Sequence, residues 1–150
     1  MSLEEFLEEW NKPSEFVEVK TSGSTGEPKR MMVEKRRMLN SARITCDFLG
    51  LKKGDTALLC MSTDYIAGKM MVVRAIERGL KLISVEPSGH PLAEKTNMEF
   101  VFSAMVPMQV YNSLQVPEER VRLMHIKHLI IGGGAIDEAM ERELREFPNA

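Results

Sequence analysis

Cysteine and histidine are scarce in this sequence, which has two cysteines, Cys46 and Cys60, and three histidines in 150 residues. The two cysteines form no C-x-x-C pair, so they predict neither a disulfide framework nor a zinc site. His125 and His128 stand three apart, but no cysteine or carboxylate nearby completes a metal set. We therefore expect free, structural thiols, a reducing compartment and no metal centre.

An excess of charge of one sign is also missing. The chain has 20 basic and 22 acidic residues, a formal net charge of -2, which gives no long-range field to attract nucleic acid or anionic lipid. No apolar run approaches the roughly 20 residues that cross a bilayer. The acidic N-terminus is unlike a secretory signal. We expect a cytoplasmic protein without a nucleic-acid or membrane partner.

The residues that are present predict one α/β domain with a mostly parallel sheet and flanking helices. The segment 56–61 is apolar on both faces, as a strand inside a parallel sheet is, and Gly50 and Gly79 are placed as helix C-caps. Helical spacing is found at 3–10, 35–48, 66–78, 107–114, from Pro117 onward and at 137–147. Strand patterns are found at 16–20, 30–33, 56–61, 80–85, 100–104 and 128–131.

Hydroxyls and glycines dominate the segment between the first two expected strands. Gly23 and Gly26 permit close backbone approach, so that N–H groups can converge on phosphate oxygens, and Lys29 adds a full charge. The segment is not a Walker P-loop, because Lys29 is followed by Arg30 and then by a strand. A solvated connector has a similar composition, so composition alone leaves both interpretations open. The order is Thr21-Ser22-Gly23-Ser24-Thr25-Gly26-Glu27-Pro28-Lys29.

This order resembles, position for position, the phosphate-binding motif of the adenylate-forming superfamily, which includes acyl-CoA synthetases, luciferases and peptide-synthetase adenylation domains. The resemblance implies that the chain is a sub-portion of the large N-terminal domain of that fold, with residues 1–150 forming a partial ATP-binding (adenylation) domain. It also assigns the ATP phosphates to Thr21, Ser22, Gly23, Ser24, Thr25, Gly26 and Lys29.

Three further segments look most like the o-succinylbenzoate-CoA ligases, the menaquinone-biosynthesis branch of the superfamily. They are 64–68 with Arg74, 103–109, and the glycine motif 129–136. By resemblance the glycine motif lies along the nucleotide and acyl group, although a plain strand-to-helix turn would look similar. The resemblance implies that four residues of this motif lie beside the nucleotide or the acyl group: Gly132, Gly133, Gly134 and Ala135.

Two departures leave the acyl specificity open. Asp64-Tyr65 stands where many relatives have an aromatic residue and a histidine, and Met108 replaces a threonine. Lys69 is an isolated charge in an apolar helix, and we hypothesise that it faces an acyl pocket with Tyr65 and binds a second carboxylate of the substrate. A lysine that reaches solvent along its stem is the alternative.

The reaction implied by the resemblance is attack of a carboxylate on the α-phosphate of Mg²⁺-bound ATP, followed by capture of the acyl adenylate by the thiol of CoA. The family's acidic, ribose-binding and lysine elements are not among residues 1–150. We therefore expect no catalytic residue within this chain and no CoA ligation by it alone. Alternatives are a non-catalytic nucleotide- or anion-binding module, or another adenylating enzyme of the superfamily, and a homodimer is left open.

Overall fold

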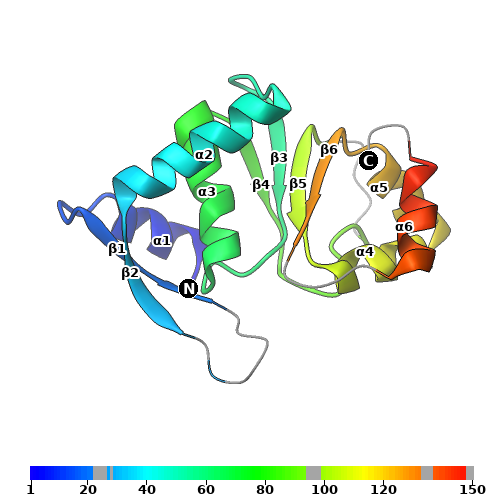
Figure 1. The fold of residues 1–150 in the computed structure, drawn as a ribbon, viewed down its shortest axis with the longest axis horizontal. Helices are drawn as coiled ribbons and strands as arrows, with labels where there is room; N and C mark the ends of the chain where they lie inside the picture. The colour runs from blue at the N-terminus through cyan, green and yellow to red at the C-terminus, as the bar shows by residue number, and fades with distance from the viewer. Residues whose placement is uncertain (22–26, 28, 94–98, 133–136, 148–150) are drawn as a thin grey trace.

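The strands form two separate sheets in a computed structural model that describes residues 1–21, 27, 29–93, 99–132 and 137–147 (Figure 1). An antiparallel hairpin pairs β1 (Phe16–Lys20) with β2 (Arg30–Glu34). A parallel sheet has the order β4-β3-β5-β6. Its strands are β3 (Thr56–Leu59), β4 (Lys81–Ser84), β5 (Phe102–Met105) and β6 (His128–Ile131). The helices are α1 (Leu3–Trp10), α2 (Lys35–Leu49), α3 (Ile66–Arg78), α4 (Pro107–Leu114), α5 (Pro117–Met124) and α6 (Glu138–Arg145).

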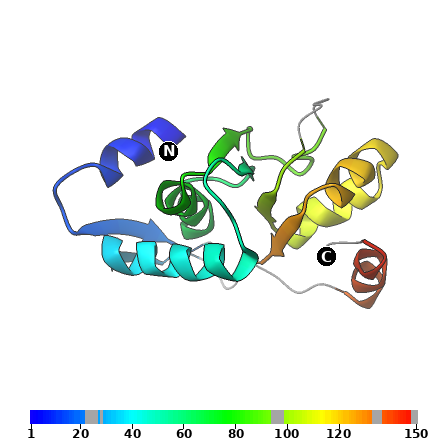
Figure 2. The same ribbon diagram turned by 90° about the horizontal axis from the view of Figure 1, so that it is seen from above.

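Helices cover both faces of the parallel sheet, α2 and α3 one face and α4 to α6 the other (Figure 2). Alternate side chains of β3 divide between two hydrophobic cores because successive residues of a strand point to opposite faces. Ala57 and Leu59 belong to the core with α2 and α3, and Leu58 to the core with α4, α5 and α6. The expected α/β fold with a mostly parallel sheet is confirmed.

The strand ends differ by one or two residues from the sequence-based expectation. The strand expected at 56–61 ends at Leu59, because the next carbonyl, that of Cys60, accepts a hydrogen bond from the side chain of Gln109. The strand expected at 100–104 runs from Phe102 to Met105. The carboxyl ends of β3 and β5 therefore leave the sheet earlier and later, respectively, than the sequence pattern indicates.

Two glycines end helices as the sequence predicts. Gly50 follows α2 with φ 66° and Gly79 follows α3 with φ 68°, both left-handed conformations that other residues adopt at a cost. At the start of α3, a Cβ on Gly68 would lie 2.0 Å from the carbonyl oxygen of Ser62. Glycine at position 68 thus lets the loop after β3 pack directly against the helix.

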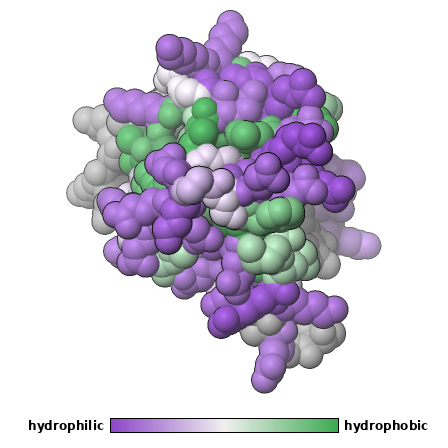
Figure 3. Space-filling view, turned by 90° about the vertical axis from the view of Figure 1, so that its left-hand side faces the viewer, coloured by the Kyte–Doolittle hydropathy of each residue, from purple (hydrophilic) through white to green (hydrophobic). Residues whose placement is uncertain are grey.

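The N-terminal helix packs through Phe6, which is fully buried in the core with α2 and α3. Around α1 and the hairpin, hydrophilic side chains cover much of the surface, and a band of hydrophobic ones interrupts them (Figure 3). The hairpin contributes the exposed apolar residues Phe16, Met31 and Met32. In the part of the chain that is described, every helix is too short or too polar to traverse a bilayer.

Candidate nucleotide and carboxylate site

The two ends of the nine-residue glycine and hydroxyl motif are joined by the hairpin. Lys20 and Arg30 are the last paired residues of β1 and β2, and the amide of Thr21 then donates a hydrogen bond to the carbonyl of Lys29 at 3.0 Å. The expectation that this loop connects two strands is confirmed. The other predicted phosphate ligands lie outside the described residues: Ser22, Gly23, Ser24, Thr25 and Gly26.

A cavity of about 300 Å³, called the switch-point cavity below, lies at the carboxyl ends of the parallel strands. From β3 the chain crosses through α3 to β4 on one side, and from β5 it crosses through α4 and α5 to β6 on the other. Neighbouring strands whose connections diverge in this way leave a crevice at their carboxyl ends, where ligands of α/β proteins bind. The lining comes from three segments, 60–68, 87–89 and 106–109.

The hairpin and the cavity face the same side of the molecule. In Figure 1 the paired tip of β1 and β2, the first turn of α3 and the carboxyl ends of the parallel strands all lie at the lower side of the view. Gly132, the first of the four residues predicted to lie beside the nucleotide or acyl group, is at this edge, because its amide donates to the carbonyl of Met105 at 3.1 Å. The other three, Gly133, Gly134 and Ala135, lie outside the described residues.

Of the two residues expected in an acyl pocket, only Tyr65 lines the cavity. The ammonium of Lys69 lies 3.4 Å from the carbonyl oxygen of Glu18 in β1 and 5.2 Å from the ring centre of Phe6. The structure therefore does not bring the side chain of Lys69 into the cavity beside the side chain of Tyr65. The reason is local: Tyr65 is the N-cap of α3 with an extended backbone, so the helical spacing of four residues does not place the two side chains on one face. Neither does Lys69 reach solvent, since it is 4% exposed.

Four side chains for which no role was predicted hold residues 88 to 92, the segment that follows β4 and forms part of the cavity wall. Asn112 donates to the carbonyl of Gly89 at 2.9 Å, and Arg122 donates to the carbonyl of Leu92 at 2.6 Å. The other contacts are those of Gln109 with Ser88 at 3.0 Å and of Glu119 with His90 at 3.0 Å. Partners 21 to 30 residues apart leave no local sequence pattern, which explains why they were missed.

The carboxylate of Asp64, which precedes Tyr65 in the loop between β3 and α3, forms an ion pair. It pairs with the N-terminal ammonium of Met1, and this hydrogen bond holds the pKa of Asp64 below its usual value. The neighbouring hydroxyl of Thr63 donates to the carbonyl of Met1 at 2.6 Å. These contacts hold the loop between β3 and α3 against the N-terminus, and Asp64 is not among the residues that line the cavity.

Cys60 lines the cavity as a protonated thiol. Burial raises its pKa to about 11, and its sulfur lies 3.6 Å from the carbonyl oxygen of Ala104. Burial also raises the pKa of Cys46, which is free and buried in the other core. Neither sulfur is therefore set up as a nucleophile, in agreement with the structural role expected for both.

We expect both thiols to resist alkylation in the folded chain. With a pKa of about 11, roughly one Cys60 thiol in a thousand is ionised at pH 8, and burial hinders the reagent further. Iodoacetamide at pH 8 should leave both unmodified in native conditions and label both in denaturant, as counted by mass spectrometry. Labelling should increase as the pH rises toward 11. Fast labelling of Cys60 in the native chain at pH 8 would contradict the buried, protonated state.

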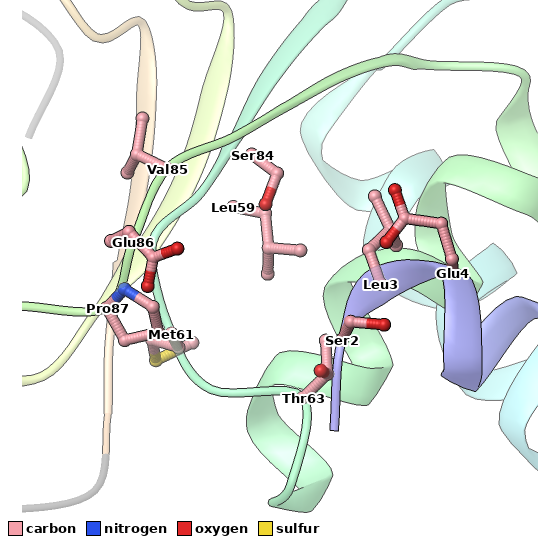
Figure 4. A pocket seen from close by; sticks show the side chains of 10 residues that line it. All are labelled: Ser2, Leu3, Glu4, Leu59, Met61, Thr63, Ser84, Val85, Glu86 and Pro87. Atoms are coloured by element: carbon pink, nitrogen blue, oxygen red, sulfur yellow. The ribbon is translucent and has the colours of Figure 1, made fainter.

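A second cavity, of about 430 Å³, lies between the start of α1 and the ends of β3 and β4. Glu4 and Glu86 lie on opposite sides of it, and hydroxyls of Ser2 and Thr63 lie near its rim (Figure 4). Met61 and Pro87 line both cavities. Its lining has two carboxylates and no basic side chain, so it does not favour a phosphate. In the described ranges, no three His, Cys, Asp or Glu side chains gather as metal ligands.

The parallel sheet with helices on both faces and a cavity at the carboxyl ends of its strands define an α/β protein, and comparison with known proteins gives the family. The chain belongs to the AMP-binding enzyme family, whose model matches residues 19–149. An acyl-CoA synthetase (AMP-forming)/AMP-acid ligase II-like protein from Dyadobacter fermentans is 33% identical and superposes with a TM-score of 0.89. The match covers 96% of this chain and 41% of that protein.

One further solved structure and one relative by sequence are similar to the chain. The o-succinylbenzoate coenzyme A synthetase of Bacillus subtilis, solved in complex with AMP, has a TM-score of 0.69 at 22% identity over 87% of this chain and 27% of its own, which supports the fold alone. Tenellin synthetase of Beauveria bassiana is 27% identical over 83% of this chain. The chain spans only 3% of that synthetase.

Proposed function

We propose that the chain supplies the ATP-phosphate loop and part of the carboxylate cavity of an AMP-forming acid–thiol ligase. The observation that carries the proposal is the 300 Å³ cavity at the switch point of the sheet, on the same side as the hairpin tip whose ends, Thr21 and Lys29, are hydrogen bonded. A carboxylate in the cavity and a triphosphate on the loop would be held by one rigid α/β unit. Such positioning is the main source of rate in a step that moves charge between phosphates.

In this proposal the loop binds and does not react. Thr21, Ser22, Ser24 and Thr25 donate hydrogen bonds and Lys29 contributes charge to the β- and γ-phosphates, while Gly23 and Gly26 allow the backbone to approach. This stabilises pyrophosphate as it leaves the α-phosphorus. ATP would bring Mg²⁺ on its phosphates, and the thiol of CoA would capture the acyl adenylate.

The acid itself has two candidates. The resemblance of three segments proposes o-succinylbenzoate, which carries a second carboxylate. The described lining of the cavity instead contains no basic side chain, and Lys69 is bonded to β1, which favours an acid with an uncharged acyl portion. Both candidates leave the adenylation chemistry the same.

The experiment is ATP–pyrophosphate exchange by the chain fused to the remaining part of the Dyadobacter fermentans protein. We expect carboxylate-dependent exchange, with uncharged aryl and acyl monocarboxylates giving higher kcat/KM than o-succinylbenzoate by about tenfold or more, because a second carboxylate would be buried without a partner. A reversed order would assign o-succinylbenzoate as the substrate. Binding of ATP without exchange for any acid would instead favour a non-catalytic nucleotide-binding module.

A further inference from the structure

The side chain of Gln109 joins all three segments that line the switch-point cavity. Its Oε1 accepts a hydrogen bond from the amide of Val106 at 3.1 Å. Its Nε2 donates to the carbonyl of Cys60 at 3.0 Å and to the carbonyl of Ser88 at 3.0 Å. Gln109 is 6% exposed and itself lines the cavity. One amide thus connects the segments that follow β3, β4 and β5.

Backbone pairing does not hold these segments together at the cavity. The β3–β5 pairing ends at Leu58 and Ser103, before the cavity begins, and the β3–β4 pairing ends at Leu59 and Ser84. One further backbone hydrogen bond, from the amide of Val85 to the carbonyl of Leu59 at 3.0 Å, precedes the cavity, and beyond it the separation of the walls depends on side chains. A primary amide carries two donors and an acceptor, and Gln109 uses all three functions here. The bond to Val106 lies within the segment of Gln109 and caps the start of α4, whereas the bonds to Cys60 and Ser88 cross to the other two walls. Among the described residues, no other side chain of one wall bonds to both of the others.

The segment after β4 also has anchors outside the cavity. Asn112, Arg122 and the His90–Glu119 contact hold residues 89 to 92 from α4 and α5. None of these contacts involves Gln109, so we expect the segment to stay attached to the domain when Gln109 is changed. Loss of the amide is then expected to alter the spacing between the walls and to leave the fold in place.

We propose that Gln109 is a positioning residue that determines the acyl specificity of the cavity. By fixing the distances between the walls at Cys60, Ser88 and Val106, it sets the width available to the acyl or aryl group of a carboxylate with an uncharged acyl portion. The nature of this ligand rests on the proposed function. The positioning itself rests only on the three hydrogen bonds.

The test compares Gln109→Met, which keeps the length of the side chain and removes every hydrogen bond, with Ser113→Ala. Ser113 lies one turn further along α4, is fully buried and has a hydroxyl without a hydrogen-bond partner among the described residues, which makes it a matched control. Hydrogen exchange of the whole chain is measured at residues 86–90 and at the Val106 amide. Calorimetry measures binding of benzoate and of 4-butylbenzoate to the same proteins.

We expect Gln109→Met to speed exchange at both places and to shift the ratio of the two dissociation constants by about tenfold toward the bulkier acid. Ser113→Ala should change neither. Gln109→Glu is a second variant, which keeps the acceptor for Val106 and loses both donors, so it should shift the ratio while the Val106 amide stays protected.

Three results would overturn parts of this inference. Unchanged exchange in Gln109→Met would refute the positioning role. Faster exchange with an unchanged ratio of dissociation constants would show a purely structural role. Failure of the unaltered chain to bind either acid would count against the proposed carboxylate site and remove the specificity role with it. If Gln109→Met does not fold, Gln109→Glu gives the same comparison.

Discussion

Replacing Lys29 with alanine is expected to slow adenylate formation by roughly 30- to 1,000-fold. The backbone of Lys29 closes the phosphate loop against Thr21 at 3.0 Å, and its exposed side chain can reach a phosphate without displacing the core. The positive charge of Lys29 beside the leaving pyrophosphate acts mainly in the transition state, so kcat and kcat/KM should fall together. ATP–pyrophosphate exchange by the fusion with the Dyadobacter fermentans segment measures the effect.

Lys52→Ala is the matched control for Lys29→Ala, because it removes the same charge from an exposed turn between α2 and β3. Exchange by this variant should stay within about twofold of the unaltered protein, since exposed charges more than about 10 Å apart are largely screened at 0.1 M salt. A loss of tenfold or less for Lys29→Ala would refute the proposed role of the ammonium. Equal losses in both variants would indicate a general effect of net charge.

Much of the fold could be predicted because its signals are local. The apolar run of β3 and the caps Gly50 and Gly79 each depend on neighbouring residues, and all three were predicted, although β3 ends two residues earlier than its apolar pattern indicates. The placement of Lys69 could not be predicted, since its partner Glu18 is 51 residues away and Tyr65 departs from helical geometry. For the site, the sequence predicted a loop between two strands, and it gave no sign that Gln109 joins three walls of a cavity.

Phe102→Ala is expected to destabilise the chain by about 3–5 kcal/mol. Phe102 is fully buried in the central strand β5, and the guanidinium of Arg74 lies 5.9 Å from its ring centre. Truncation would leave a cavity between the sheet and α3 and would remove the aromatic face beneath the half-buried guanidinium of Arg74. Because domains are stable by only about 5–15 kcal/mol, this change should markedly lower the urea midpoint, followed by circular dichroism.

The chain contains a control of identical chemistry for Phe102→Ala. Phe48 lies on α2 with 87% of its surface exposed, and Phe48→Ala should change the free energy of unfolding by no more than about 0.5 kcal/mol. Equal effects of the two substitutions would mean that the parallel sheet is not the stabilising core. A large loss for Phe48 alone would show that its exposed face is covered by a partner in solution.

The strand order β4-β3-β5-β6 also determines how the chain can fold while it is being synthesised. The central strand β3 leaves the ribosome before both of its neighbours, and β4 can pair with it as soon as residue 84 has emerged. The opposite edge of β3 stays unpaired until Phe102 emerges. At roughly 5–20 residues per second, the synthesis of the chain from the end of β3 to Phe102 takes several seconds. During that time an apolar strand edge is unpaired, the kind of surface that chaperones bind and that otherwise aggregates. After β5 has paired, its other edge stays unpaired until β6 emerges, so for this topology the vulnerable period of biosynthesis ends with β6 and not with the first completed βαβ unit.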